Sequence, residues 1–353
     1  MSKTRKRNKT LFVSDVHMSA GRSLKPGYKR HAYDWLNETE AARFAGFLEQ
    51  VSKRSDVSEL VLLGDIFDNW ICPVDEIPPT LGEIVRADQN RATVEQLKIL
   101  AKHPKIDLVF VPGNHDMSVK TRYLSRYLPG VKFKMKYRNR KILAEHGHNY
   151  TLFNAPDRLN APRTALPLGY FISRVVTTQA ANTGTTERHV WGYVDDLLEA
   201  LGPQKMAASV WEAVLEEANL SDSTQIRMSR KAKISAKTIK RVYADLFDQW
   251  TRRVGLGATI RALMAEVGQI GNVADRLCKK RDTNIVIFGH NHRPAVDKDT
   301  WFVDDRIYAN CGTWVGGKAP TYIEIETAKS KNHVRLYEWH GNSKLIRKET
   351  LRA

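Results

Sequence analysis

Five short clusters of aspartate, histidine and asparagine contain the candidate metal-binding and catalytic residues of this 353-residue sequence. They are Asp15-Val16-His17, Gly64-Asp65-Ile66-Phe67-Asp68, Gly113-Asn114-His115-Asp116, His146-Gly147-His148 and Gly289-His290-Asn291-His292. Carboxylate, imidazole and amide-oxygen groups suit Mn²⁺, Fe or Zn²⁺, and no cluster contains a thiolate that would select a softer metal. Together the clusters indicate a site for divalent transition metals.

Each cluster directly follows a short apolar run, as a strand-end loop does. The runs are Leu11–Ser14, Leu60–Leu63, Leu108–Val111, Ile142–Glu145 and Ile285–Phe288. In open α/β sheets, sites form at the carboxyl ends of strands, where loops converge. A single cluster has ordinary explanations, such as a turn, a helix cap or a buried histidine. All five in this order favour one shared site.

The apolar runs alternate with helical patterns, which is typical of an α/β domain. The predicted helices cover 40–53 and 87–102. The predicted strands cover 10–14, 59–64, 107–112, 131–137, 141–145, 284–289, 307–311, 321–326 and 333–339.

Residues 155–281 differ, because helical periodicity replaces the strand runs. One apolar stripe runs from Ile239 to Trp250 and a second from Ile260 to Leu277, with Ser235 as the expected N-cap of the first helix. Between residues 221 and 281 there are 14 Lys and Arg against five Asp and Glu. We therefore expect a core formed by residues 1–154 and 282–353, with 155–281 as a basic helical insertion that either caps the site or only packs on the core.

The overall composition limits the expected partners and cellular location of the protein. The formal net charge of +17 favours a polyanionic partner, such as nucleic acid, an anionic membrane or a phosphorylated metabolite, although charge alone also serves solubility. No apolar run is long enough for a transmembrane segment. Three separated cysteines indicate no disulfide framework. We expect a cytoplasmic protein, with or without peripheral association with a membrane.

The five clusters resemble the signature of the calcineurin-like metallophosphoesterases: Asp-x-His, Gly-Asp-x-x-Asp, Gly-Asn-His-Asp, His-Gly-His and Gly-His-x-His. The resemblance covers residues 10–154 and 284–340. It implies a four-layer αββα sandwich of two mixed β-sheets, with a helical insertion, and two metal ions at the strand ends.

The same resemblance implies roles for individual residues. Asp15, His17 and His292 would bind one metal, Asn114, His146 and His290 the other, and Asp65 would bridge them. Two such ions, with Mn most expected and Fe or Zn as alternatives, would hold a bridging hydroxide that attacks phosphorus. Asp68 would hold a ligand histidine in its tautomer, and His148 would face the substrate or support the ligands.

His115 is not among the implied ligands and follows one directly. We expect it to act as the general acid that protonates the leaving group, with Asp116 orienting it. The alternative is that His115 only contacts the phosphate.

The substrate is indicated less directly. Asn69-Trp70 and Asp116 disfavour the protein phosphatases of the family. The run from Gly64 to Ile71, Gly289-His-Asn-His-Arg-Pro294 and Gly312-Thr-Trp314 are similar to the UDP-2,3-diacylglucosamine hydrolases. That branch has arginine where this chain has His115, and its helical insertion is much shorter.

The loop 18–37 contains Arg22 and Arg30 with aromatic residues between its cations. It could bind a substrate phosphate and stack a base, or it could be an ordinary solvated loop. The leading hypothesis is hydrolysis of a phosphodiester or pyrophosphate bond in a nucleotide-linked or lipid-linked small substrate. The alternatives are a nuclease acting on DNA or RNA, and a non-catalytic scaffold that retains the fold, which the complete ligand set disfavours.

Overall fold

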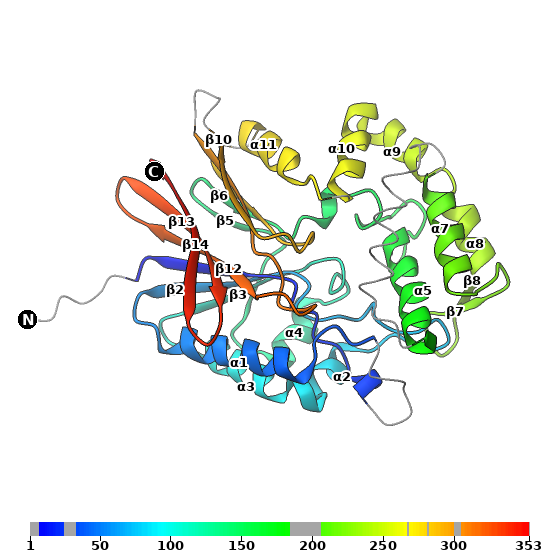
Figure 1. Cartoon of the computed structure of the whole chain (residues 1–353), viewed down its shortest axis with the longest axis horizontal. Coiled ribbons are helices and arrows are strands. Elements are labelled where there is room, and N and C mark those ends of the chain that lie inside the picture. Colours follow the sequence, from blue (N-terminus) through cyan, green and yellow to red (C-terminus); the bar gives the residue numbers. More distant parts are fainter. Residues whose placement is uncertain are drawn as a thin grey trace, which may run out of the picture.

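Two mixed β-sheets lie face to face in the computed structural model, which describes residues 7–24, 33–183, 206–266, 268–280, 282–299 and 305–352 (Figure 1). The first sheet has the strand order β14-β13-β12-β1-β2-β3-β4. Its central strands β1, β2 and β3 are parallel neighbours, while β12, β13 and β14 add antiparallel pairs. The strands are β1 (Lys9–Val13), β2 (Val57–Leu63), β3 (Asp107–Val111), β4 (Lys132–Phe133), β12 (Thr321–Thr327), β13 (Lys331–Trp339) and β14 (Ser343–Arg352).

The second sheet has the order β10-β11-β9-β6-β5. Its inner strands β11, β9 and β6 are parallel, and β10 and β5 close the edges in antiparallel orientation. The strands are β5 (Tyr137–Asn139), β6 (Ile142–Ala144), β9 (Ile285–Phe288), β10 (Ala295–Asp299) and β11 (Arg306–Asn310).

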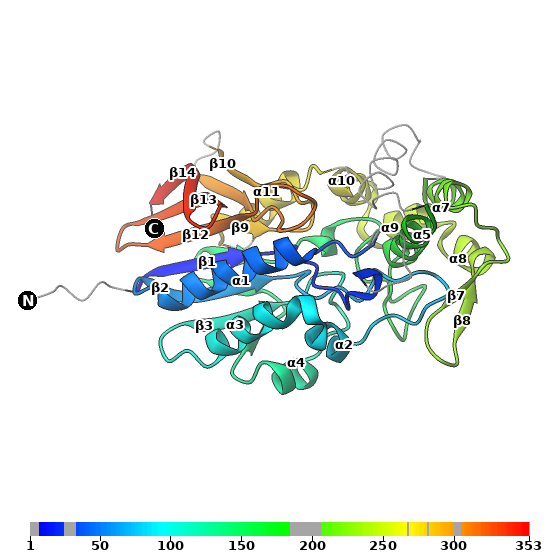
Figure 2. The same ribbon diagram turned by 60° about the horizontal axis from the view of Figure 1, so that its bottom comes forward.

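Helices cover the outer faces of both sheets, as Figure 2 shows from a second direction. The first sheet carries α1 (Glu38–Lys53), α2 (Leu81–Arg86), α3 (Arg91–Ala101) and α4 (Thr121–Tyr127), and α11 (Gly271–Lys280) contacts β9 and β11 of the second. Asn37 starts α1 with a capping box, in which its side chain accepts from the Glu40 amide and Glu40 accepts from the Asn37 amide.

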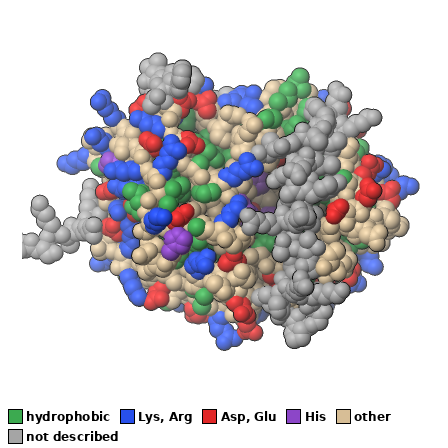
Figure 3. Space-filling model, in the orientation of Figure 1, with side chains coloured by type: hydrophobic (Ala, Val, Ile, Leu, Met, Phe, Trp, Pro, Cys, Tyr) green, Lys and Arg blue, Asp and Glu red, His purple; other side chains and the backbone are tan. Residues whose placement is uncertain are grey.

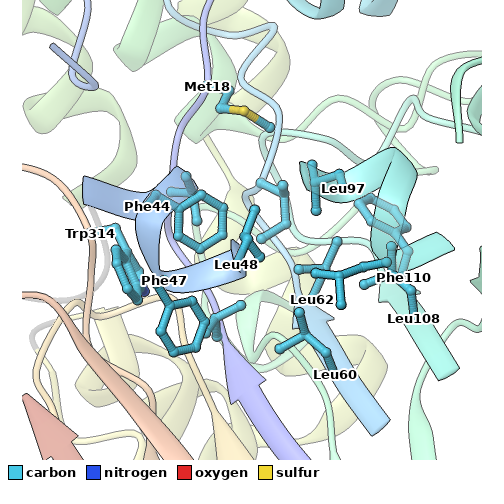
Figure 4. Packing of buried hydrophobic residues seen from close by; sticks show 14 of the residues in the cluster. Met18, Phe44, Phe47, Leu48, Leu60, Leu62, Leu97, Leu108, Phe110 and Trp314 are labelled. Atoms are coloured by element: carbon cyan, nitrogen blue, oxygen red, sulfur yellow. The ribbon is translucent and has the colours of Figure 1, made fainter. Parts of the chain in front are cut away.

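Three buried clusters separate these layers. The first joins α1 and α3 to the outer face of the first sheet, where Phe44, Phe47 and Trp314 pack against Leu60 and Leu62 (Figure 4). The second lies between the two sheets and the third between the second sheet and α11. Alternate residues of β2 therefore point to opposite faces, as the two-residue period of a strand requires. The expected αββα architecture is confirmed.

A further cluster lies at the end of the molecule away from the N-terminus, and it is mostly built from the helices between the two halves of the core (Figure 1). These elements are α5 (Leu168–Thr183), α7 (Met206–Glu217), α8 (Ala236–Tyr243), α9 (Leu246–Val254) and α10 (Leu256–Glu266), with a hairpin of β7 (Gln225–Arg227) and β8 (Lys233–Ser235). Ser235 caps α8 as expected, because its hydroxyl accepts from the Thr238 amide. Within the described residues, no helix has the length and apolar character needed to cross a membrane.

Several predicted elements differ in the structure. The strand predicted over 131–137 is divided between β4 and β5, because the chain leaves the first sheet and joins the second within it. The stripe from Ile239 to Trp250 lies on two helices, α8 and α9, that are separated at Ala244–Asp245. The three-residue strands of the β7–β8 hairpin are too short to show an alternating pattern in the sequence. The prediction also lacks β10 and β14.

Candidate metal centre

All five predicted clusters lie at one edge of the two sheets. β1, β2 and β3 deliver the first three, and β6 and β9 deliver the other two. Hydrogen bonds join neighbouring loops directly: the Asp15 amide donates to Gly64 O (3.1 Å) and the Gly289 amide to His146 O (3.0 Å). Because both sheets end at this edge, residues separated by up to 277 positions share one site.

The backbone at this edge is unusual. Five of the predicted ligands have positive φ angles between 50° and 72°: Asp15, His17, Asp65, His290 and His292. Side-chain-bearing residues rarely adopt this region, and each instance costs about 1–3 kcal/mol. Such strain persists where the surrounding structure enforces it, which is typical of functional sites.

Two glycines make room for the ligands. A Cβ atom on Gly113 would lie 2.1 Å from Asp65 Oδ1, and one on Gly64 would lie 2.5 Å from His146 Nδ1. Both contacts are far shorter than van der Waals separation. The glycines in these motifs are therefore required by close approach of the side chains that carry the chemistry.

One group of side chains consists of Asp15, His17 and His292. His292 Nε2 lies 3.1 Å from Asp15 Oδ1 and 3.2 Å from His17 Nε2, while His17 Nε2 lies 3.9 Å from the same oxygen. Asp15 and His17 are buried, whereas the His292 side chain is 26% exposed. We call Asp15, His17 and His292 the open group, after the partly exposed His292; His290 in the other group is also partly exposed.

The other group surrounds His146. His146 Nε2 lies 3.0 Å from Asp65 Oδ2, and donor atoms of Asp65, His146 and His290 all lie within 4.8 Å of one another. Donor atoms of Asp65, His17 and His115 also lie within 4.8 Å of one another. The carboxylate of Asp65 therefore faces both groups. Asn114, the remaining predicted ligand, is buried. It lies near Asp65, because the backbone amide of the next residue, His115, donates to Asp65 Oδ1 (2.9 Å).

Asn114 Oδ1 is buried and makes no hydrogen bond to any described residue. Asp15 Oδ1 and His146 Nε2 have no partner other than neighbouring predicted ligands, His292 and Asp65 among them. Burial of an unpaired polar atom is costly, so such atoms indicate a missing partner. A carboxylate oxygen, an amide oxygen and an imidazole nitrogen that converge in this way fit a divalent transition metal. The residues present thus fit the metal ions that the resemblance implies.

The electrostatics support cation binding. Although burial opposes ionisation, His292 and His146 lower the pKa of Asp15 to about 2, and His146 and His115 hold the pKa of Asp65 well below its usual value. Despite burial, Asp65 and Asp15 raise the pKa of His146 to about 10, so its proton balances the two carboxylates. A divalent cation would take the place of that proton.

Asp68 lies behind the open group. Its Oδ2 is 2.7 Å from His17 Nδ1, where the sequence interpretation places it, and 2.8 Å from His115 Nδ1. Its Oδ1 accepts from the backbone amides of Trp70 and Ile71 (2.9 and 3.0 Å). Asp68 is therefore fixed at both oxygens, and it can orient two imidazoles at once.

Asp116 does not contact the His115 side chain, contrary to expectation. Its carboxylate accepts from the backbone amides of Gly113 (2.6 Å), Ile66 (2.9 Å) and Phe67 (3.3 Å). Burial and the nearby charge of Asp65 raise the pKa of Asp116 to about 7. Asp116 therefore ties the β3 loop to the β2 loop, and Asp68 is the carboxylate beside His115.

Two tryptophans surround His115. The Trp70 ring stacks on it with the centroids 4.5 Å apart and an interplanar angle of 29°. The half-buried Trp35 lies 5.7 Å from His115, 4.4 Å from His17 and 5.8 Å from His292. Trp35 comes from the loop predicted to stack a base, and it forms an aromatic wall on the open side. Figure 3 shows histidine atoms in a hollow on one face of the molecule.

The predicted substrate residues lie in different places. His148 is buried beside His146 and His290, and burial with those two charges lowers its pKa well below the usual value. Arg22 makes ion pairs with Glu76 (2.9 Å) and Glu83 (3.0 Å). Arg30 lies outside the described residues.

The basic insertion contains a cation that is not available to a substrate. Arg174, in α5, is fully buried and donates to the carbonyl oxygens of Cys72, Pro73 and Glu76. The apolar stretch before it, from Leu168 to Ile172, is also buried. These side chains hold the insertion to the loop that follows Trp70.

Sequence reasoning did not find Thr151, Asn154 and Glu266. The Thr151 hydroxyl is 3.4 Å from His290 Nε2, and Asn154 Oδ1 is 3.4 Å from Asn114 Nδ2. Glu266 accepts from the Asn154 side chain at 3.1 Å. No local signal marks them, because their partners lie 40 to 139 positions away in the chain.

Comparison with known proteins agrees with the motifs. Residues 9–175 match the family model described as calcineurin-like phosphoesterase. A UDP-2,3-diacylglucosamine hydrolase of Shewanella piezotolerans is 26% identical over 152 residues, which are 42% of this chain. The chain spans about half (51%) of the length of this relative.

Solved structures are more distant. A dimetal phosphatase from Danio rerio is 10% identical, with a TM-score of 0.42 and coverage of 98% and 99% of the two chains. Vacuolar Protein Sorting 29 from Cryptosporidium parvum is 11% identical, with a TM-score of 0.36 and coverage of 98% of each chain. Both TM-scores are below 0.5, so neither structure informs the assignment. The family model over residues 9–175 and the five motifs do, and they make this chain similar to the calcineurin-like phosphoesterases.

Proposed function

We propose that this phosphoesterase hydrolyses a phosphodiester or pyrophosphate bond with two divalent metal ions. The observation that carries the proposal is the position of Asp65. Its carboxylate lies within 4.8 Å of a ring nitrogen of His17 on one side, and of ring nitrogens of His146 and His290 on the other. Asp15, His17 and His292 would hold one ion, and Asn114, His146 and His290 the other. The convergence of Asp15 Oδ1, His17 and His292 supports one ion, and the buried Asn114 Oδ1, which makes no hydrogen bond to a described residue, supports the other.

The bound ions would supply Lewis acidity and an activated water for attack at phosphorus. His115 would protonate the leaving oxygen. Burial lowers its pKa, but the charges of Asp68 and Asp65 outweigh burial and raise the pKa above the usual histidine value, which favours the protonated imidazole. Trp70 stacks on the ring and Asp68 lies at its Nδ1, which leaves Nε2 as the nitrogen that can face a substrate.

The substrate we favour is a nucleotide-linked or lipid-linked small molecule. The half-buried face of Trp35 beside His292 is suited to stacking on a planar base, as aromatic side chains do in nucleotide sites. The matched relative, named for a UDP-linked lipid, supports the same class. In this proposal residues 155–281 form a cap at the site, and the protein is cytoplasmic, with peripheral contact to an anionic membrane as one route to a lipid-linked substrate.

A nuclease is the second candidate, and the charge supports it. The excess of 56 Lys and Arg over 39 Asp and Glu would attract a polyphosphate backbone. The two candidates predict different responses to salt, because binding to duplex DNA weakens with a slope of about −0.9 per phosphate contact in log units.

A substrate panel tests the proposal. Metal-reconstituted protein is assayed against bis-p-nitrophenyl phosphate, nucleotide-sugar pyrophosphates, and single-stranded and duplex DNA. We expect cleavage of the first two classes and little cleavage of DNA at 0.15 M salt. Cleavage of DNA with the steep salt dependence, and no cleavage of the pyrophosphates, would establish the nuclease instead. Protein that is metal-loaded and inert toward all of them would contradict both.

A further inference from the structure

The segment 151–154 lies between the metal centre and the helical insertion. Asn154 Oδ1 accepts from Asn114 Nδ2 at 3.4 Å, and Thr151 Oγ1 lies 3.4 Å from His290 Nε2. Asn114 and His290 belong to the same group of predicted ligands, the one around His146. The segment therefore contacts two of the three residues that would hold one particular ion.

Glu266 fixes this segment from the insertion side. It is the last residue of α10, and its Oε1 accepts from the backbone amides of Phe153 and Asn154. Its Oε2 accepts from Asn154 Nδ2 at 3.1 Å. Three donors of the segment thus converge on one carboxylate. Gly169, at the start of α5, adds a second constraint, since a Cβ there would lie 2.3 Å from Asn154 Oδ1.

The carboxylate determines which way the two asparagine side chains point. Burial raises the pKa of Glu266 to about 7. The ionised carboxylate only accepts, so in that form Asn154 directs its NH₂ group toward Glu266 and its oxygen toward Asn114. Asn114 must then direct its own NH₂ group toward Asn154. This leaves Asn114 Oδ1, which is buried and unpaired among the described residues, as the atom that faces the metal centre.

The same segment determines the tautomer of His290. The Thr151 hydroxyl donates to His148 O at 3.0 Å, so toward His290 it can only accept. His290 Nε2 therefore carries the proton, and Nδ1 keeps its lone pair. A hydrogen bond at one ring nitrogen commonly selects the nitrogen that binds a metal.

We propose that Glu266 is a positioning residue for the ion of the His146 group, and that it acts through Asn154 and the segment 151–154 on Asn114 and His290. The inference rests on the proposed two-metal function. It assigns part of the metal centre to the insertion, so that changes in α10 alter one metal site and leave the other intact.

Glu266→Gln tests the proposal with a small change in shape. Its NH₂ group would face the NH₂ group of Asn154, which favours rotation of Asn154 and, with it, Asn114. Mn²⁺ binding to metal-stripped protein is measured by titration calorimetry. Loss of such supporting contacts commonly weakens metal affinity about 10–100-fold. We expect a loss of that size in one of two binding events and less than about a twofold change in the other.

Glu216→Gln, on the exposed face of α7, is the matched control and should change neither event. Thr151→Val removes the contact to His290 with nearly the same shape, and it decides the question if Glu266→Gln fails to fold. The proposal is supported if either folded variant weakens one event alone. It is overturned if both events are unchanged or weaken equally. Wild-type protein with two binding events and no hydrolysis would contradict the proposed function and leave this inference standing.

Discussion

The two ligand groups around Asp65 are held by different parts of the chain. In the open group, Asp68 holds His17, and the His290 amide donates to Asp15 Oδ2 at 3.0 Å, so all supports come from strand-end loops of the core. In the His146 group, the core carbonyl of Leu63 lies 2.8 Å from His146 Nδ1, and the segment 151–154, at the end of the first half of the core, is bound by Glu266 of the insertion. The segment 151–154 and Glu266 support Asn114 and His290.

The difference shows how one fold can vary its chemistry. Supports in the core are set by the sheet edge and change little without disturbing the fold. A support in an inserted helix can change with the insertion. Trp70 also connects the site to the insertion. It stacks on His115, and it belongs to the buried cluster formed mostly by the insertion helices. Under the proposed function, metal affinity and leaving-group protonation would both depend on contacts with the insertion.

The largest effect should come from Asp65, which serves both groups. Asp65→Asn removes the shared negative charge at nearly the same shape. Metal ions contribute several kcal/mol to transition-state stabilisation, so we expect hydrolysis of bis-p-nitrophenyl phosphate to fall by about 10³-fold or more. Circular dichroism should show a folded protein. A folded variant that retains more than a tenth of the activity would mean that the two groups do not share this carboxylate.

His115 should have the next largest effect, and only with demanding leaving groups. His115→Ala removes the proton donor, which commonly contributes about 10²–10⁴-fold. We expect a loss in that range for an alkyl leaving group and a much smaller loss for p-nitrophenolate, which departs without a proton. The ratio of kcat/KM values for the two substrates measures this. Equal losses would show that His115 serves as a phosphate contact.

Asp68 should have a smaller effect, and its effect on metal binding should be confined to the open group. Asp68→Asn would place an NH₂ group against His17 Nδ1 and His115 Nδ1 if its oxygen stays on the amides of Trp70 and Ile71. We expect one Mn²⁺ binding event to weaken about 10–100-fold. It should be the event that Glu266→Gln leaves unchanged, and the double variant should weaken both. If the two variants affect the same event, the separation of the groups is wrong.

The predicted ligands can be picked out from the sequence, and the structure brings them together, because each lies directly at its strand end. Asp15, for example, follows an apolar run and precedes His17 at the spacing of a known motif, so neither the fold nor a distant contact is needed to find it. The two mixed sheets follow for the same reason, since long buried strands such as β2 and β12 are evident from short windows of sequence. Short elements at the edges, such as β4 and β5, depend on their neighbours and were placed less well.

The supports of the ligands were harder to predict. Asp116 adjoins His115 in the chain, which suggested a contact, but the loop turns its carboxylate onto backbone amides instead. Glu266 lies 112 positions from Asn154, in a helix whose pattern indicates only packing. Contacts across the fold decide both, and a single sequence does not record them.

The most direct test of the two-metal account is the number of ions needed for activity. Metal-stripped protein is titrated with Mn²⁺ while bound metal and hydrolysis of bis-p-nitrophenyl phosphate are measured in the same samples. The account predicts that activity rises with occupancy of the second site and reaches its maximum at two ions per chain. Full activity at one bound ion per chain, or in protein that binds none, would contradict it.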